Sequence, residues 1–185
     1  MTLLRTSLLL LAVGFMMQMS PVQAQEKVFG EEVLGPGVKI TFLVAPSGDV
    51  EPEPQHLPES RSDLHVEVLA GWTEEASDEV GAPAGGFVPY LHLFATVENE
   101  KTGEVKKASL VPHVNQTDNV HYARNIALPG AADDPYTVVF EVHPPQQLEL
   151  ATHRDWRMAY GNRLFPPATV TYKNLQLEEI VRTTR

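Results

Sequence analysis

Apolar and polar residues alternate with a period of two in four stretches of the chain, and this pattern limits the fold more than any other feature. The stretches are residues 64–69, 90–97, 136–143 and 169–173. Successive side chains of a β-strand point to opposite faces of the sheet, so this period predicts strands with one buried face. No window of a dozen residues shows the period of an amphipathic helix. We therefore predict an all-β protein, an antiparallel β-sandwich.

Turn-forming residues separate these predicted strands. Residues 99–103 place Asn and Gly between two apolar runs, which is typical of a hairpin connection. Residues 129–130, a Pro-Gly pair, and residues 133–135, which end in proline, mark a second break. Short strands at regular spacing with polar turns favour the sandwich over a mixed fold.

The chain divides into three parts. Residues 1–24 have the character of a leader, and residues 25–62 hold one strand-like run, 38–44, followed by an irregular proline-rich segment. We expect residues 63–185 to form the remainder of a single sandwich domain. The tail from Leu177 is predicted to be strand-like and then to fray.

The leader matches a secretory signal peptide. Arg5 provides a positive n-region, residues 8–17 are apolar, and Ala24 is a small residue at the cleavage position. The apolar run is shorter than the roughly 20 residues that a membrane-spanning helix needs. We therefore expect cleavage after Ala24 and no stable membrane insertion afterwards. An exported chain without cysteine fits the periplasm, which we predict as its location.

The charge balance excludes one class of partner. Residues 1–24 contain one basic and no acidic residue, so 13 of the 14 basic and all 24 acidic residues remain in the mature chain, a net charge of −11. Such a surface repels nucleic acid and attracts cations. We expect no nucleic-acid partner.

Histidines carry most of the chemical information. The seven are His56, His65, His92, His113, His121, His143 and His153. On an alternating strand, His65 and Glu67 point to the same sheet face and offer one nitrogen and one oxygen ligand. Glu141 and His143 have the same spacing, so spacing alone does not separate the two pairs.

Three further histidines are candidates to join such a pair. His113 and His121 bracket a polar stretch, and we expect a loop there to aim both imidazoles at one point. His153 lies in another polar stretch. A site of nitrogen and oxygen ligands suits Cu(II), Fe(II), Mn(II) or Zn(II). A zinc hydrolase remains open on this evidence, but the chain has no cysteine nucleophile, nucleophile elbow, phosphate loop or helical zinc-protease motif.

Several segments in one order resemble the bacterial periplasmic iron-transport family, whose members are associated with iron permeases. The segments are residues 63–67, 87–91, 110–113, 121–126 and 140–145, followed by His153-Arg154. The resemblance implies an immunoglobulin-like β-sandwich, a homodimer, a Cu(II)-binding site near or equal to the iron site, and no enzymatic activity. It also favours His65/Glu67 over Glu141/His143.

Carried over residue by residue, the resemblance implies a metal site formed by His65, Glu67, His113, His121 and His153. The family usually has a methionine where this chain has His113. A thioether favours Cu(I), whereas an imidazole favours harder divalent ions. Arg124 replaces a glycine of the family, Asp155 and Gly71 replace histidines, and Val120 replaces a proline.

These observations predict a periplasmic protein that holds a divalent transition-metal ion, Fe or Cu(II) with Mn or Zn as alternatives. We expect it to act in iron uptake and to deliver metal to an inner-membrane permease. The alternatives are a copper-handling protein, a metal-dependent enzyme on the same residues, and an immunoglobulin-like module with surface histidines only.

Overall fold

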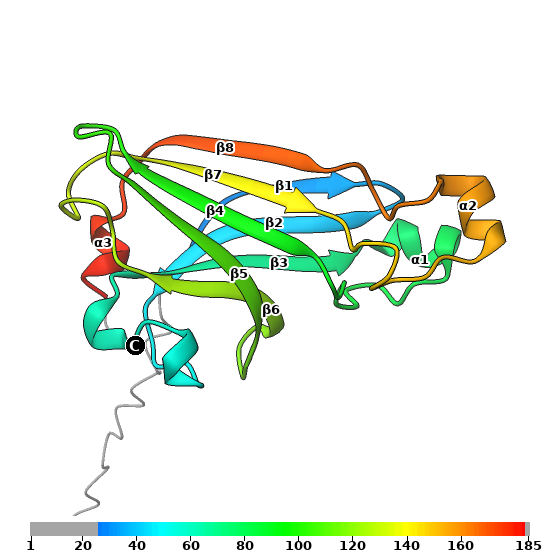
Figure 1. Cartoon of the computed structure of the whole chain (residues 1–185), viewed down its shortest axis with the longest axis horizontal. Coiled ribbons are helices and arrows are strands. Elements are labelled where there is room, and N and C mark those ends of the chain that lie inside the picture. Colours follow the sequence, from blue (N-terminus) through cyan, green and yellow to red (C-terminus); the bar gives the residue numbers. More distant parts are fainter. Residues whose placement is uncertain (1–25, 184–185) are drawn as a thin grey trace, which may run out of the picture.

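The computed structural model describes residues 26–183, so the predicted signal peptide lies outside the described residues. Eight antiparallel strands form one continuous sheet in the order β1-β2-β3-β6-β5-β4-β7-β8 (Figure 1). The strands are β1 Lys27–Leu34, β2 Val38–Pro46, β3 Leu64–Trp72, β4 His92–Asn99, β5 Val105–Asn115, β6 Asn119–Ile126, β7 Tyr136–His143 and β8 Ala168–Leu175.

Strand β5 belongs to both layers of the sandwich. Its first half pairs with β4, with Leu110 opposite Leu93, and its second half pairs with β6, with Val111 opposite Ala123. The sheet therefore folds over itself along β5, with β1, β2, β3 and β6 on one side and β4, β7 and β8 on the other (Figure 1). The predicted all-β, antiparallel sandwich is confirmed.

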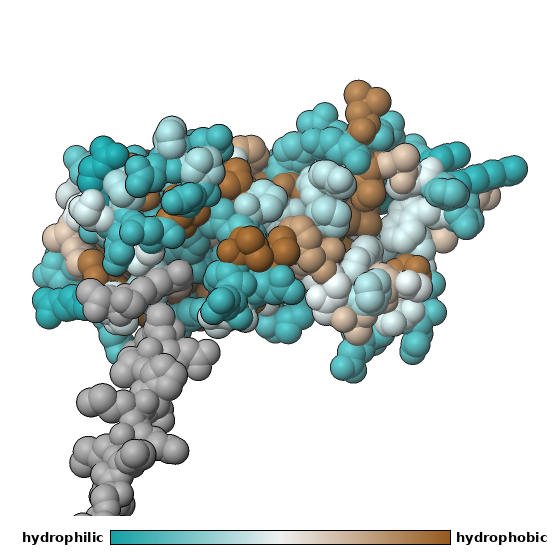
Figure 2. All heavy atoms as spheres, turned by 90° about the horizontal axis from the view of Figure 1, so that it is seen from below, coloured by the Kyte–Doolittle hydropathy of each residue, from teal (hydrophilic) through white to brown (hydrophobic). Residues whose placement is uncertain are grey.

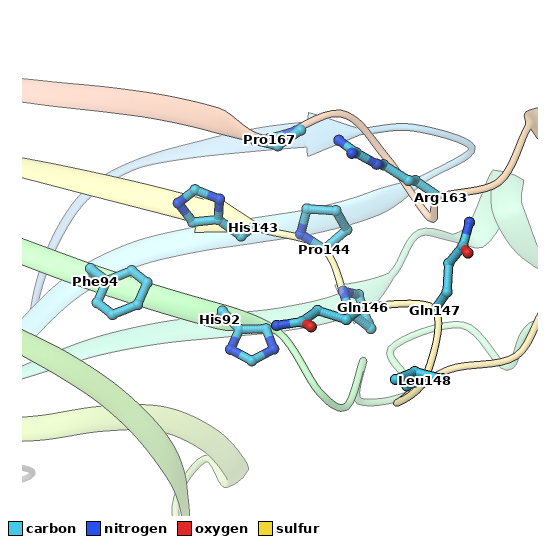
Figure 3. Close-up of a pocket in the computed structure, with 10 residues that line it drawn as sticks. His92, Phe94, His143, Pro144, Gln146, Gln147, Leu148, Arg163 and Pro167 are labelled. Carbon is cyan, nitrogen blue, oxygen red and sulfur yellow. The ribbon is translucent and has the colours of Figure 1, made fainter.

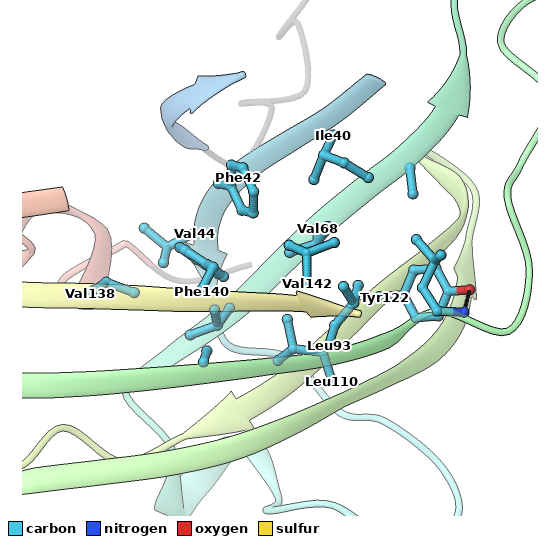
Figure 4. Packing of buried hydrophobic residues seen from close by; sticks show 14 of the residues in the cluster. Ile40, Phe42, Val44, Val68, Leu93, Leu110, Tyr122, Val138, Phe140 and Val142 are labelled. Atoms are coloured by element: carbon cyan, nitrogen blue, oxygen red, sulfur yellow. Dashed lines mark hydrogen bonds between the residues drawn. The ribbon is translucent and has the colours of Figure 1, made fainter. Parts of the chain in front are cut away.

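The core lies between the two layers. It consists of the apolar side chains that alternate along each strand and point inward. On β7, Val138, Phe140 and Val142 are at most 1% exposed. The ring centroids of Phe42 on β2 and Phe140 lie 4.7 Å apart (Figure 4). Burial of side chains of this size stabilises the fold by about 1.5–3 kcal/mol each. The alternation seen in the sequence thus fixes which face of each strand meets the core.

The helices are short. They are the 3₁₀-helices η1 Glu53–Gln55 and η2 Glu59–Arg61, and the α-helices α1 Glu74–Val80, α2 Arg154–Tyr160 and α3 Glu178–Val181. None of the helices in the described part of the chain is long and apolar enough to cross a membrane.

One local prediction was wrong, and one strand was missed. The tail does not continue as a strand after Leu177 but forms α3, because Leu177 and Ile180 are buried in the core at 0% and 2% exposure. Strand β1 was not predicted at all. Its burial pattern is irregular, since it is an edge strand that pairs only with β2 and contains a register shift near Gly30.

Replacing Phe140 with alanine should lower the free energy of unfolding by about 3–5 kcal/mol, because the cavity would lie in the middle of the core. Phe94 on β4 is the matched control, since its ring is 40% exposed on the outer face. Phe94→Ala should change the free energy by no more than about 0.5 kcal/mol. Urea unfolding followed by circular dichroism measures both values, and similar losses in the two variants would contradict this placement of the core.

Candidate metal centre

The first pair of candidate ligands lies on the outer face of β3. His65 and Glu67 are two residues apart, so both point away from the core that Val66 enters. Both are nevertheless buried, at 2% and 0% exposure. His65 Nε2 lies 3.7 Å from Glu67 Oε1. The sequence pattern therefore predicted their shared face, but not their burial.

His113 and His121 face each other directly across the β5–β6 pair. The expected loop between them is shorter than the sequence suggested, because strand pairing continues to Asn115 opposite Asn119. The Asn115 side-chain oxygen accepts hydrogen bonds from the backbone N–H groups of Thr117 and Asp118, at 2.9 and 2.6 Å. Asn119 has a φ of +59°, which asparagine tolerates better than most residues. This tight turn holds the two histidines in register.

Three imidazoles converge where β3, β5 and β6 meet. His65, His113 and His121 each offer a nitrogen, and these atoms all lie within 4.8 Å of one another. His113 Nδ1 is 3.3 Å from His65 Nε2. Nitrogens bound to one Zn or Cu ion at about 2.0–2.1 Å lie no more than about 4 Å apart, so small movements bring this cluster to coordination geometry.

Asn125 orients His65. The Asn125 amide nitrogen donates hydrogen bonds to the carbonyls of Gly48 and Leu57, at 2.7 and 2.8 Å. Its oxygen must therefore accept the 2.6 Å hydrogen bond from His65 Nδ1. This assigns the proton to Nδ1 and directs the Nε2 lone pair at the cluster, as in many metal sites. The sequence did not indicate Asn125, because only the pairing of β3 with β6 places it directly opposite His65.

Burial, followed by the nearby His56, His121 and Arg124, lowers the pKa of His113 to about 4. His113 is therefore neutral near pH 7, which metal coordination requires. Its Nε2 is buried and makes no hydrogen bond to any described residue. A buried polar atom without a partner is costly.

His56 lies beside the cluster, where the sequence did not place it. Its ring centroid is 4.9 Å from that of His113, and the residue is 9% exposed. Burial, followed by the positive charge of Arg124, lowers the pKa of His56. Arg124 donates to the carbonyls of Ser109 and Gln55, which places its charge at the edge of the cluster. No periodic signal could have found His56, because it belongs to the proline-rich segment.

Oxygen ligands adjoin the imidazoles. Carboxylate oxygens of Glu26, Glu67 and Asp118 lie within 4.8 Å of one another. Glu67 therefore belongs to this acidic group and also contacts His65. The chemistry of the combined set, imidazole nitrogen with carboxylate oxygen and no sulfur, fits a divalent transition ion.

His153 is not part of this cluster within one chain. It is exposed and forms the N-cap of α2. Figure 1 shows α2 at one end of the molecule, well separated from the β5–β6 hairpin. The alternative pair, Glu141 and His143, lies on the outer face of β7 in the other layer, with side chains 47% and 43% exposed.

Comparison with known proteins identifies a family and several relatives. The model of the family described as Fe2+ transport protein matches residues 23–178. A UPF0423 protein of Brucella abortus is 29% identical over 154 residues, which cover 82% of this chain and 81% of that protein. The family is one of transport proteins, which confirms the prediction that the chain is not an enzyme.

Two solved structures are similar in fold and sequence. FetP of uropathogenic Escherichia coli strain F11, as a copper-bound variant, is 27% identical with a TM-score of 0.63, covering 83% of this chain and 99% of that chain. A copper-bound variant of Campylobacter jejuni P19 is 27% identical with a TM-score of 0.67, covering 81% and 96%.

The depressed pKa of His113 predicts a pH dependence of stability. The unfolded chain protonates this imidazole near its ordinary value of 6.5, whereas the folded chain does so only near 4. The unfolded state therefore binds more protons between these values, and the free energy of unfolding of the metal-free protein should fall as the pH drops from about 6.5 to about 4. Urea unfolding across this range tests the slope. His113→Met removes the titrating group and should flatten it, so an unchanged slope in that variant would refute the assignment.

Proposed function

The chain belongs to the Fe2+ transport protein family, and from this premise we propose that it binds one divalent transition-metal ion in the periplasm as part of iron uptake. The observation that carries the proposal is the convergence of three imidazoles beside a buried carboxylate. His65, His113 and His121 would supply nitrogen ligands and Glu67 an oxygen ligand. Residues with no such role would rarely be buried together, because each loses its hydration.

The ligand set supports Fe(II) or Cu(II), with Mn(II) and Zn(II) as weaker alternatives. Cu(II) binds most nitrogen and oxygen sites more tightly than the other divalent ions do, whatever the physiological cargo. The related FetP and P19 structures hold copper. A copper-handling role is therefore the second candidate. An imidazole at position 113 in place of a thioether favours the harder ions.

We propose that His153 reaches the ion from a second copy of the chain. His153 is exposed, and the nearby Leu148 and Met158 are 99% and 79% exposed, so a second copy packed here would bury apolar surface. Val114 on the β5–β6 hairpin is 74% exposed beside the cluster. Figure 2 views the side on which this hairpin projects and shows apolar side chains among hydrophilic ones. A homodimer that joins these surfaces would cover both and complete the site.

Delivery to an inner-membrane permease follows from a carrier role in iron uptake. The predicted export of the chain would place it on the same side of the inner membrane as the opening of such a permease. Binding between the purified chain and the permease in detergent, with and without metal, tests this step. Equal binding by metal-loaded and metal-free protein would count against delivery.

Removing two imidazoles from the cluster should abolish retention of metal. The variant His65→Ala/His121→Ala should lose at least about 100-fold in affinity for Cu(II) and Zn(II), because too few ligands remain. Isothermal titration calorimetry and metal content after dialysis are the measurements. His92→Ala/His143→Ala is a matched control with two exposed imidazoles and should retain the tightly bound ion.

Glu67→Gln tests the oxygen ligand at constant volume. Affinity should fall by about 10–100-fold, while the fold is kept. Glu98→Gln, on the exposed face of β4, is the control and should bind as the wild type does. Equal affinities for Glu67→Gln and the wild type would remove Glu67 from the site.

Mixing two defective variants tests the role of His153 in a dimer. His153→Ala and His65→Ala/His121→Ala should each bind poorly alone, but their mixed dimers should contain one intact site. A 1:1 mixture should therefore recover about a quarter of the sites. If His153 acted within its own chain, mixing would recover none. Arg154→Ala is the control, and light scattering that shows only monomer with and without metal would refute the dimer.

A further inference from the structure

A hollow of about 720 Å³ lies away from the cluster, over the outer face of β4 and β7. His92, Phe94, His143 and Pro144 line it, together with the segment that follows β7 (Figure 3). One of these residues, His143, belongs to the Glu141/His143 pair, which has the same spacing in the sequence as His65/Glu67. The proposed function uses none of these residues.

Two histidines from neighbouring strands line this hollow. His92 on β4 is directly opposite His143 on β7 in the antiparallel register. Their neighbours Leu93 and Val142 are each 1% exposed in the core, so both imidazoles project to the outer face. Directly opposite residues have Cβ atoms about 4.5–5.5 Å apart, which lets two imidazoles reach one ion by side-chain rotation.

Each imidazole already has a carboxylate beside it. His92 Nε2 lies 2.7 Å from Glu149 Oε2, and His143 Nε2 lies 3.7 Å from Glu141 Oε2. The hydrogen bonds from His92 and from the Gln146 backbone lower the pKa of Glu149, so its carboxylate is charged near pH 7. The Glu149 loop is thereby held against the strand pair, with its negative charge facing His92.

From these contacts we infer a second metal-binding site, formed by His92, His143 and Glu149, with Glu141 at its edge. An ion between the strands would take the place of the proton in the His92–Glu149 hydrogen bond. Two histidines and one carboxylate with open positions suit Fe(II) and related divalent ions. Arg163 opposes a cation but lies at the far end of the hollow, beyond Pro144 (Figure 3).

This site differs from the buried cluster in two respects. It lies in the other layer of the sandwich, and its side chains are between 34% and 47% exposed. The ion would keep several water ligands and exchange readily with solvent. We therefore expect weaker binding than at the cluster, and a protein that takes up two ions per chain, one tightly and one weakly.

Calorimetric titration of untagged protein with CuCl₂ and with ZnCl₂ tests the inference. The wild type should show two binding steps, and His92→Ala/His143→Ala should lose only the weaker one. Glu149→Gln should weaken that step by about tenfold, while Glu98→Gln leaves it unchanged. A wild type with a single step, or a weaker step that survives in His92→Ala/His143→Ala, would overturn the second site.

The buried cluster and the second site can be judged separately. His65→Ala/His121→Ala should lose the tight step and keep the weak one. Because that variant removes buried side chains, wild-type protein first loaded with one equivalent of Zn(II) provides an independent measurement. A second equivalent should then shift the NMR signals of the His92 and His143 imidazoles. Unchanged signals would contradict the inference, whatever the cluster binds.

Discussion

The register between β5 and β6 is the constraint on which the candidate centre depends. It sets His113 directly opposite His121 and, through the pairing of β6 with β3, brings both beside His65. A slip of one residue would turn every side chain of the strand to the other face. The tight turn built on Asn115 and Asn119 prevents that slip. The geometry of three imidazoles is thus maintained by backbone pairing rather than by contacts among the histidines themselves.

Burying such a cluster costs hydration, and the surrounding structure is organised to offset that cost. Asn125 satisfies His65 and is itself held by two carbonyls of the segment that covers the outer face. His113 stays neutral because burial, followed by the neighbouring His56 and His121 imidazoles and the Arg124 guanidinium, disfavours its charged form. His113 Nε2 is buried without a partner among the described residues, so this compensation is incomplete. Such a centre lowers the folding stability of the chain, but it holds the imidazole nitrogen lone pairs in position for a ligand.

The proline-rich segment has a larger role than its irregular sequence suggests. It carries His56 to within 4.9 Å of the His113 ring, and Arg124 bonds to its Gln55 carbonyl. The Arg124 guanidinium therefore lies at the edge of the proposed site, together with the His56 imidazole. A nearby positive charge lowers the affinity for any cation, and the carboxylates of Glu67 and Asp118 oppose that effect.

The sequence by itself determined where β3, β4, β7 and β8 lie and the face to which each of their alternating side chains points, because a period of two is a local property of extended backbone. It therefore predicted the sandwich and the shared face of His65 and Glu67. Tertiary structure decided which strands pair, and so placed His121 opposite His113, added His56 and Asn125, and left His153 of the same chain apart. It also made Leu177 and Ile180 part of a buried helix instead of a frayed strand. Contacts of this kind join residues tens of positions apart, and no short-range periodicity encodes them.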